Sequence, residues 1–281
     1  MNTYKKIKTF ELKFKKNLGS NLFGAYKSAF IGSGIEFSEI KQYAYGENIK
    51  NIDWKTTAKK GELYTKKYEE ERDLNVIFVL DISKSMNFGS KDITKKQLQE
   101  EIFYTLGLSA IENDDNVGAI IYDEEIKEFI FPKKGFGNLY KILEKLEQNG
   151  TKNKNTINIL KEIIKRHIKK SLIFILTDDE KIDDEKVLKI ASKENQIIII
   201  NIFDFFENNL FLNNSNLALN LDKSSININL DKQKITEFVN LRKENLENFK
   251  NKLQKNHIGY LYIDTNMNFY NELRQYFYKI S

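Results

Sequence analysis

The chain alternates short apolar runs with longer stretches in which apolar residues recur every three or four positions. Such runs are typical of strands buried on both faces of a parallel sheet, and the longer stretches are typical of helices that cover it. The predicted strands are residues 63–68, 74–80, 117–122, 126–131, 171–177, 197–203, 226–230 and 259–264, and the predicted helices are 93–112, 137–148, 156–167, 183–195, 232–255 and 268–279. This order predicts an α/β fold with a doubly wound, mostly parallel sheet.

The N-terminal part of the chain departs from this alternation. Residues 3–18 place apolar side chains at helical spacing among lysines, which predicts a basic amphipathic helix that ends near Gly19. We expect its apolar side to pack on the rest of the chain and its lysines to face solvent; a membrane surface or nucleic acid is the alternative partner. From Phe23 to Phe37, aromatic and small residues alternate around glycines and predict short strands.

The segment from residue 39 to residue 71 holds Trp54, the only tryptophan of the chain. Asn48 or Asn51 can cap a short helix here, and Gly61 can end it. We expect Trp54 to be a packing anchor against the sheet, because an indole ring buries a large apolar surface. Together these patterns predict an N-terminal accessory β/α layer, residues 1–72, packed on a main domain of residues 73–281.

Composition narrows the chemistry. The chain has 45 basic and 40 acidic residues, a net charge of +5 that is too even to indicate nucleic-acid binding by itself. It has no cysteine, which excludes disulfides, thiolate chemistry and cysteine-bound metal clusters. It has two histidines. No apolar run is long enough to span a bilayer and the N-terminus lacks the pattern of a signal peptide, so a cytoplasmic location is expected.

Oxygen-bearing side chains follow the most apolar predicted strand, in the sequence LNVIFVLDISKSM. Asp81, Ser83 and Ser85 occupy every second position there, so their oxygens can converge at the carboxyl end of the strand. A second buried strand ends in Asp178, and Thr156 opens a predicted helix that belongs to the same edge of the sheet. Hard oxygen ligands suit Mg²⁺, although Asp and Ser also serve as turn residues and Thr as an ordinary helix cap.

Two sets of motifs carry a family resemblance. The DISKS loop, the downstream Thr and the strand that ends in TD resemble the metal-ion-dependent adhesion site of von Willebrand factor type A domains. The segment GIEFSEIKQYAYGENIKNIDWKTTAKKGELYTKKYEEE resembles the diagnostic stretch of the domain-of-unknown-function fifty-eight family, bacterial proteins associated with MoxR-type AAA+ ATPases. The chain departs from that family at Gln42 or Lys41, where an Arg is usual, and at Glu47 and Asn48, where two Asp are usual.

The resemblance implies a set of metal ligands and a function. The implied ligands of Mg²⁺ or Mn²⁺ are Asp81, Ser83, Ser85, Thr156 and Asp178, with Thr151 as the fallback for Thr156. The implied function is a non-enzymatic, metal-dependent protein-interaction module that binds an acidic residue of a MoxR-type AAA+ ATPase or of its client protein.

Two other functions remain open from the residues. A metal-dependent hydrolase of nucleic acid or phosphate esters is the first alternative, although a haloacid-dehalogenase-type phosphatase needs an Asp where this chain has Ser83. No P-loop motif occurs, and hydroxyl-rich ligation supplies no obvious general base. A basic nucleic-acid binder is the second alternative, and nucleic acid is not the expected partner.

Overall fold

The computed structural model of the protein describes most of the chain. The described residues are 3–31, 39–44, 52–67, 74–148, 150–151, 153–179, 182, 184–205, 216–221, 224–229 and 232–281.

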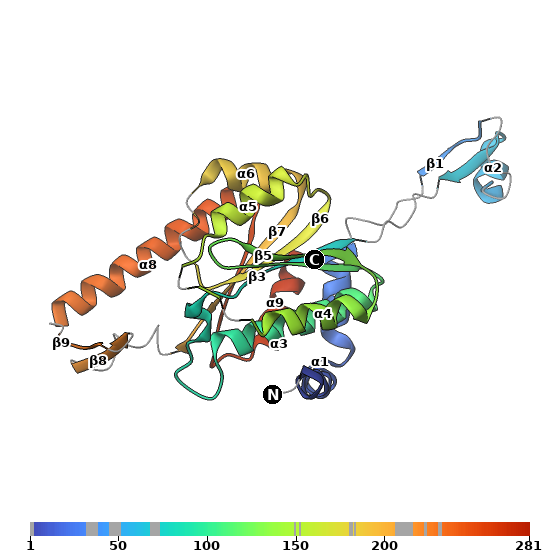
Figure 1. The fold of residues 1–281 in the computed structure, drawn as a ribbon. Coiled ribbons are helices and arrows are strands. Elements are labelled where there is room, and N and C mark those ends of the chain that lie inside the picture. The colour runs from blue at the N-terminus through green and yellow to red at the C-terminus, as the bar shows by residue number, and fades with distance from the viewer. Residues whose placement is uncertain are drawn as a thin grey trace.

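A six-stranded sheet forms the centre of the protein (Figure 1). Its strands lie in the order β10-β7-β6-β3-β4-β5, and all are parallel except β5, which pairs antiparallel with β4. Their bounds are β3 Asn75–Asp81, β4 Asn116–Tyr122, β5 Ile126–Lys133, β6 Ser171–Thr177, β7 Gln196–Phe203 and β10 Gly259–Asp264. The chain adds β4 and β5 on one side of β3 and then β6, β7 and β10 on the other. The predicted doubly wound sheet is therefore confirmed, and its strand order reverses between β3 and β6.

Strand β3 shows why an apolar run becomes a central strand. Its alternate residues Phe78 and Leu80 pack into a core on one face of the sheet, and Ile77 and Val79 pack into a core on the other face. All four are buried, so both faces of the strand must be covered. The polar residue Asp81 follows immediately, at the edge where the strand ends.

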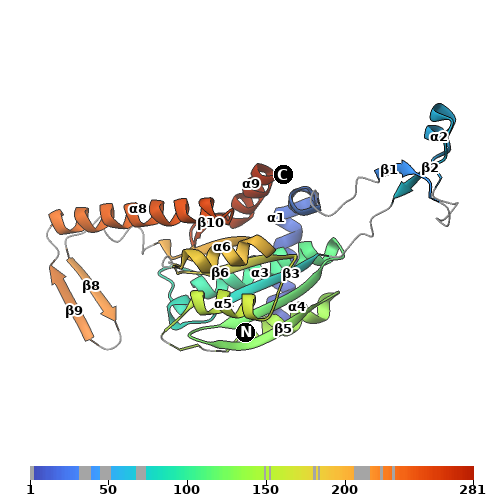
Figure 2. The same ribbon diagram turned by 90° about the horizontal axis from the view of Figure 1, so that it is seen from above.

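Helices cover both faces of the sheet (Figure 2). One core includes residues of α1, α3, α4 and α9, and the other includes residues of α5, α6 and α8. Most of these helices were predicted within two residues at each end. Their bounds are α1 Thr3–Ile31, α3 Lys95–Glu112, α4 Phe136–Leu146, α5 Thr156–Lys165, α6 Glu185–Glu194, α8 Lys232–Lys255 and α9 Phe269–Ile280.

Helix α1 differs from the prediction in its length. It continues past Gly19 to Ile31, so the strands expected between Phe23 and Phe37 are wrong up to that residue, and residues 32–37 lie outside the described residues. Tyr26 and Phe30 are one helical turn apart, and both rings contact Phe277 of α9. Helical spacing of the buried residues thus outweighed the local alternation of aromatic and small residues.

Two lysines of α1 reach acidic residues of α3, although 45% of the Lys13 side chain stays exposed and 22% of the Lys6 side chain. Lys6 pairs with buried Glu100 at 3.1 Å, and Lys13 pairs with buried Glu101 at 2.9 Å. Both acids lie on α3, so these ion pairs join α1 to the main domain. Whether residues 1–72 form one accessory layer stays a prediction.

A small unit contains β1 (Glu39–Gln42), α2 (Trp54–Lys60) and β2 (Tyr64–Lys67), in which the two strands pair antiparallel. Asp53 caps the helix by accepting the N–H of Lys55, so the caps expected at Asn48 or Asn51 are wrong, while Gly61 ends the helix with φ 78° as predicted. Trp54 is 65% exposed, so the expectation of a packing anchor is wrong as well. None of the residues of α2 is buried, and the helix therefore offers no core for the indole to enter.

The segment before α8 also differs from the prediction. Strand β9 (Ser224–Asn229) pairs with β8 (Asn216–Leu221) in a separate two-stranded sheet, and β8 is not among the predicted strands. The strand predicted at residues 226–230 thus forms, but outside the main sheet. Within the described part of the chain, no helix combines the length and the apolar character needed to cross a membrane.

Candidate metal centre

The site begins at the end of β3, where Asp81 is fully buried. Its Oδ1 accepts the backbone N–H of Ser83 at 2.8 Å, and its Oδ2 accepts the hydroxyl of Thr177 at 2.8 Å. The first bond turns the chain out of the sheet, and the second ties β3 to the last residue of β6. Asp81 therefore shapes the loop and joins the two strand ends at the point where the strand order reverses.

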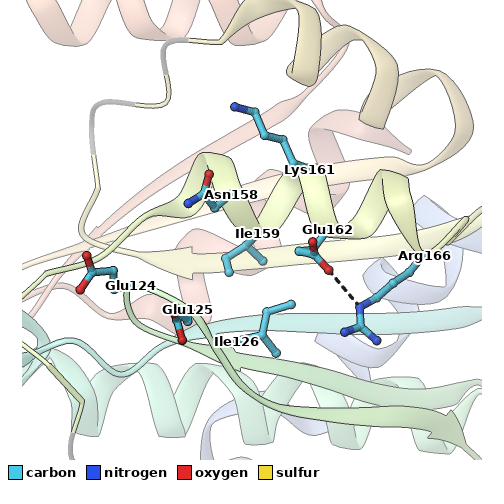
Figure 3. Close-up of a pocket in the computed structure, with 8 residues that line it drawn as sticks. All are labelled: Glu124, Glu125, Ile126, Asn158, Ile159, Lys161, Glu162 and Arg166. Atoms are coloured by element: carbon cyan, nitrogen blue, oxygen red, sulfur yellow. Dashed lines mark ion pairs between the residues drawn. The ribbon is translucent and has the colours of Figure 1, made fainter.

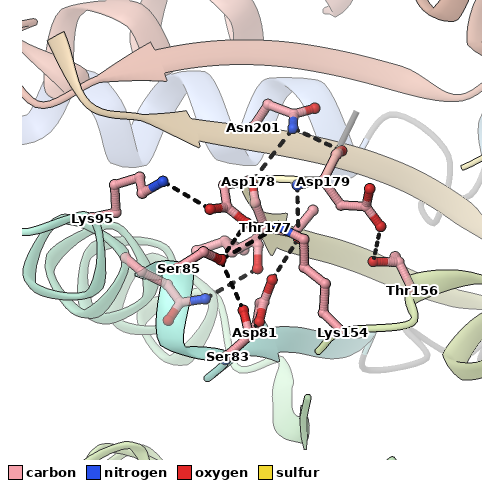
Figure 4. A network of polar contacts seen from close by, with 12 residues as sticks. Asp81, Ser83, Ser85, Lys95, Lys154, Thr156, Thr177, Asp178, Asp179 and Asn201 are labelled. Atoms are coloured by element: carbon pink, nitrogen blue, oxygen red, sulfur yellow. Dashed lines mark hydrogen bonds and ion pairs between the residues drawn. The ribbon is translucent and has the colours of Figure 1, made fainter. Parts of the chain in front are cut away.

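Ser83, Ser85 and Asp178 lie together at the edge of the sheet where β3 and β6 end (Figure 4). Ser83 Oγ and Ser85 Oγ are 3.1 Å apart, and Ser85 donates its hydroxyl to Asp178 Oδ1 at 3.2 Å. A short 3₁₀ helix, η2 (Lys84–Asn87), begins between the serines, and buried Met86 anchors it in the core. The structure thus brings together four of the five residues proposed as ligands, namely Asp81, Ser83, Ser85 and Asp178.

Two lysine side chains reach the carboxylate of Asp178. Lys95, the first residue of α3, places Nζ 2.8 Å from Oδ2, and Lys154, in the loop before α5, contacts Oδ1. The Nζ of Lys154 is also 3.5 Å from Ser85 Oγ. A buried carboxylate is stable only when it is paired, and here two ammonium groups pair with it.

Thr156 lies next to the group around Asp178 but binds a different carboxylate. Its hydroxyl donates to Asp179 Oδ2 at 2.9 Å and lies 3.0 Å from the hydroxyl of Tyr122. Burial, and then the negative charge of Asp81, raise the pKa of Tyr122 well above its ordinary value, so this phenol stays neutral. The fallback residue Thr151 donates its exposed hydroxyl to the carbonyl of Asn153 at 3.3 Å.

The loop that carries Lys154 is fixed at both ends. Buried Asp123 accepts the N–H of Thr151 on Oδ2 at 2.8 Å, and its carbonyl accepts the N–H of Asn155 at 3.0 Å. The N–H of Lys84 donates to the carbonyl of Thr151 at 2.9 Å, which joins this loop to the DISKS loop. Asn155 then caps α5 by accepting the N–H of Asn158. The backbone position of Lys154 is therefore set by its neighbours.

The residues present fit a hard cation in their chemistry. The groups that converge are two hydroxyls and one carboxylate, all oxygen ligands of the kind that Mg²⁺ prefers. A positive group, the ammonium of Lys154, already contacts two of them, Ser85 and Asp178. Across the described residues, no group of three or more His, Cys, Asp or Glu side chains is close enough to hold a metal ion. Any metal at this point would thus be bound mainly by hydroxyls.

Sequence reasoning missed both lysines. Lys95 follows an ordinary capping residue, Thr94, and Lys154 lies in a polar loop, so neither stands out as a local pattern. The one available signal is electrostatic, because a carboxylate at the end of a buried strand requires a partner.

A separate cavity of about 380 Å³ lies between the β4–β5 turn and α5 (Figure 3). Glu124 and Glu125 line it from the turn, and Lys161, Glu162 and Arg166 line it from the helix. Arg166 Nε lies 3.6 Å from Glu162 Oε2, so part of this charge is paired within the wall. The mixed charges give the cavity no clear preference for one class of ligand.

Comparison with known proteins gives a family match and several partial ones. The model of the family described as "Protein of unknown function DUF58" matches residues 39–240. Two mycobacterial proteins, uncharacterized protein Rv1480 of Mycobacterium tuberculosis and uncharacterized protein Mb1516 of Mycobacterium bovis, are each 29% identical over 92 residues. That stretch is 33% of this chain and 29% of each relative, so the match spans less than a third of either protein.

Two solved structures are similar over most of the chain at low identity. The crystal structure of the conserved hypothetical protein BatB from Bacteroides thetaiotaomicron has a TM-score of 0.47 at 14% identity and covers 74% of this chain and 98% of BatB. The VWA domain of SpRpn10 has a TM-score of 0.41 at 12% identity and covers 72% of this chain and 94% of that domain.

Proposed function

Because the chain belongs to the DUF58 family of proteins of unknown function, whose model matches residues 39–240, we propose that it is a metal-dependent protein-interaction module. The observation that carries the proposal is the convergence of Ser83, Ser85 and Asp178 at the point where the strand order reverses. Ligands of doubly wound sheets bind at this place. The family resemblance supports a divalent cation, Mg²⁺ or Mn²⁺, as the ligand.

The side chains divide the work of such a site. Ser83, Ser85 and Asp178 supply the oxygens that hold the cation, while Asp81 acts from behind them by fixing the loop and the end of β6. Thr156 and Asp179, which bind each other, form the adjoining wall. A cation bound mainly by neutral hydroxyls keeps most of its positive charge and attracts a carboxylate from outside.

An acidic partner also suits the surroundings of the site. Lys84 lies between the two serines in the chain and its side chain is exposed. A positive side chain at the rim increases the rate of encounter with a negatively charged surface. From the family resemblance, we propose that the partner is a MoxR-type AAA+ ATPase or its client, bound through an Asp or Glu side chain.

The contacts of the two carboxylates favour docking over hydrolysis. Asp81 accepts hydrogen bonds on both oxygens, and Asp178 is paired with Lys95 and Lys154. A general base needs a carboxylate oxygen that can approach a water molecule, and the oxygens of both carboxylates are already engaged in these contacts. This arrangement therefore supports a docking role more strongly than the alternative role as a hydrolase.

A binding assay with the MoxR-type ATPase from the same genome tests the proposal. Immobilised protein should retain the ATPase in Mg²⁺ and release it in EDTA, and Ser83→Ala should reduce retention at least about tenfold, the loss of one good ligand contact. Ser192→Ala on α6 is the matched control, because that hydroxyl only donates to the carbonyl of Lys189. Retention that is the same in EDTA and in Ser83→Ala would refute metal-dependent docking.

A further inference from the structure

The ammonium of Lys154 lies among the proposed metal ligands (Figure 4). It contacts Asp178 Oδ1 and is 3.5 Å from Ser85 Oγ, and Ser85 itself donates to the same Oδ1. A positive group that touches both a ligand hydroxyl and a ligand carboxylate has the position and the charge sign of a bound cation. A divalent ion and this ammonium cannot hold the same carboxylate oxygen without strong repulsion.

The two lysines on Asp178 differ in their access to solvent. The side chain of Lys95 is only 2% exposed, and its Nζ lies 5.8 Å from the ring centroid of Phe88. The side chain of Lys154 is 22% exposed and comes from a loop. Lys154 is therefore the partner that can leave toward water, and Asp178 keeps Lys95 as a partner when it does.

Release of Lys154 needs no movement of its backbone. Asp123 and Lys84 fix the loop through the hydrogen bonds to Thr151 and Asn155. Only the four-carbon side chain has to rotate, and a lysine side chain regains rotamer freedom when it becomes solvated. Exchange of an ammonium for a metal ion at Asp178 is thus a local event.

We propose that Lys154 is a built-in competitor of the divalent cation, which neutralises Asp178 in the metal-free protein and is displaced when the metal binds. This inference rests on the proposed function and adds its regulation, because the site accepts a partner only at metal concentrations that displace Lys154. The competition lowers the affinity for metal, since binding must first break the contact between Lys154 and Asp178. Once displaced, the Lys154 side chain lies in solvent at the rim of the site.

Mn²⁺ titration followed by electron paramagnetic resonance tests the competition. Lys154→Met keeps most of the side-chain length without the charge, and it should bind Mn²⁺ at least about tenfold more tightly than the parent protein, which corresponds to about 1.4 kcal/mol. Lys161→Met removes the same charge from α5, where the side chain is 53% exposed, and should change the affinity less than about twofold because that charge is screened. Lys154→Arg should bind no more tightly than the parent protein.

A labelling experiment follows the lysine itself. Reductive methylation read by mass spectrometry should modify Lys154 slowly in EDTA and faster in saturating Mg²⁺, while the rate at Lys161 stays constant. Equal Mn²⁺ affinity in the parent and Lys154→Met, or a Lys154 labelling rate indifferent to Mg²⁺, would refute the competition and leave the metal site standing. Absence of Mn²⁺ binding in the parent and in Lys154→Met alike would refute the metal site and the competition together.

Discussion

Asp123 offers a quantitative test of how the site loop is held. Burial alone raises the pKa of a carboxyl, but hydrogen bonds from the N–H groups of Thr151 and Glu125 and from Lys127 outweigh it and lower the pKa from 3.8 to about 2. Each pKa unit corresponds to about 1.4 kcal/mol, so the carboxylate contributes about 2 kcal/mol to stability. Lys127 is partly exposed, so most of this comes from the two N–H groups.

The sign of the effect follows from the direction of the shift. Because the folded pKa is below the unfolded value, the contribution is fully present above about pH 4 and is lost as the pH falls through about 2. Asp123→Asn should therefore lower the free energy of unfolding by about 2 kcal/mol at pH 7, and the difference from the parent should shrink toward zero near pH 2. Urea denaturation at a series of pH values measures it.

The matched control is Asp114→Asn, because Asp114 is exposed and its φ of 65° is one that Asn readily adopts. That variant should stay within about 0.5 kcal/mol of the parent. An Asp123→Asn variant as stable as the parent at pH 7, or a difference that does not change with pH, would contradict the role assigned to this carboxylate.

Three further substitutions test the packing around the site and the elements that the sequence misplaced. Gly150→Ala should lower the free energy of unfolding by about 1–3 kcal/mol in urea denaturation, because the added Cβ would clash with the carbonyl oxygen of Ile82. The control is Gly137→Ala on α4, where the added Cβ meets nothing within 4 Å and should not destabilise the protein. Phe277→Ala should cost about 3–5 kcal/mol, because its ring packs against α1; a cost under about 1 kcal/mol, close to the range of surface substitutions, would contradict that packing. Trp54→Ala should change stability by less than about 0.5 kcal/mol, and a larger loss in thermal unfolding would show that the indole is buried after all.

The parts of the fold that the sequence predicted are those whose pattern is local. Strands β3 and β6 are continuous apolar runs, and each ends in a polar residue, so the sequence indicated both their burial and the meeting of Asp81 and Asp178 at one edge. Parallel pairing of adjacent strands brings their carboxyl ends together.

The parts that the sequence did not predict depend on contacts between distant segments. Lys95 and Lys154 reach Asp178 across 83 and 24 residues, and no local pattern distinguishes them from solvated lysines. The extension of α1 beyond Gly19 depends on its contact with α9, at the other end of the chain. Thr156 has the predicted position at the start of α5, but its hydroxyl binds Asp179, a choice between adjacent carboxylates that spacing alone does not decide.

An anomalous difference map at the manganese absorption edge, from crystals of the protein soaked in MnCl₂, shows directly whether a metal ion binds at this site. We expect a peak within coordination distance of Ser83 Oγ, Ser85 Oγ and Asp178 Oδ1, with the Lys154 side chain turned toward solvent. A map with no peak at this point in saturating Mn²⁺, and with Lys154 still on Asp178, would contradict it.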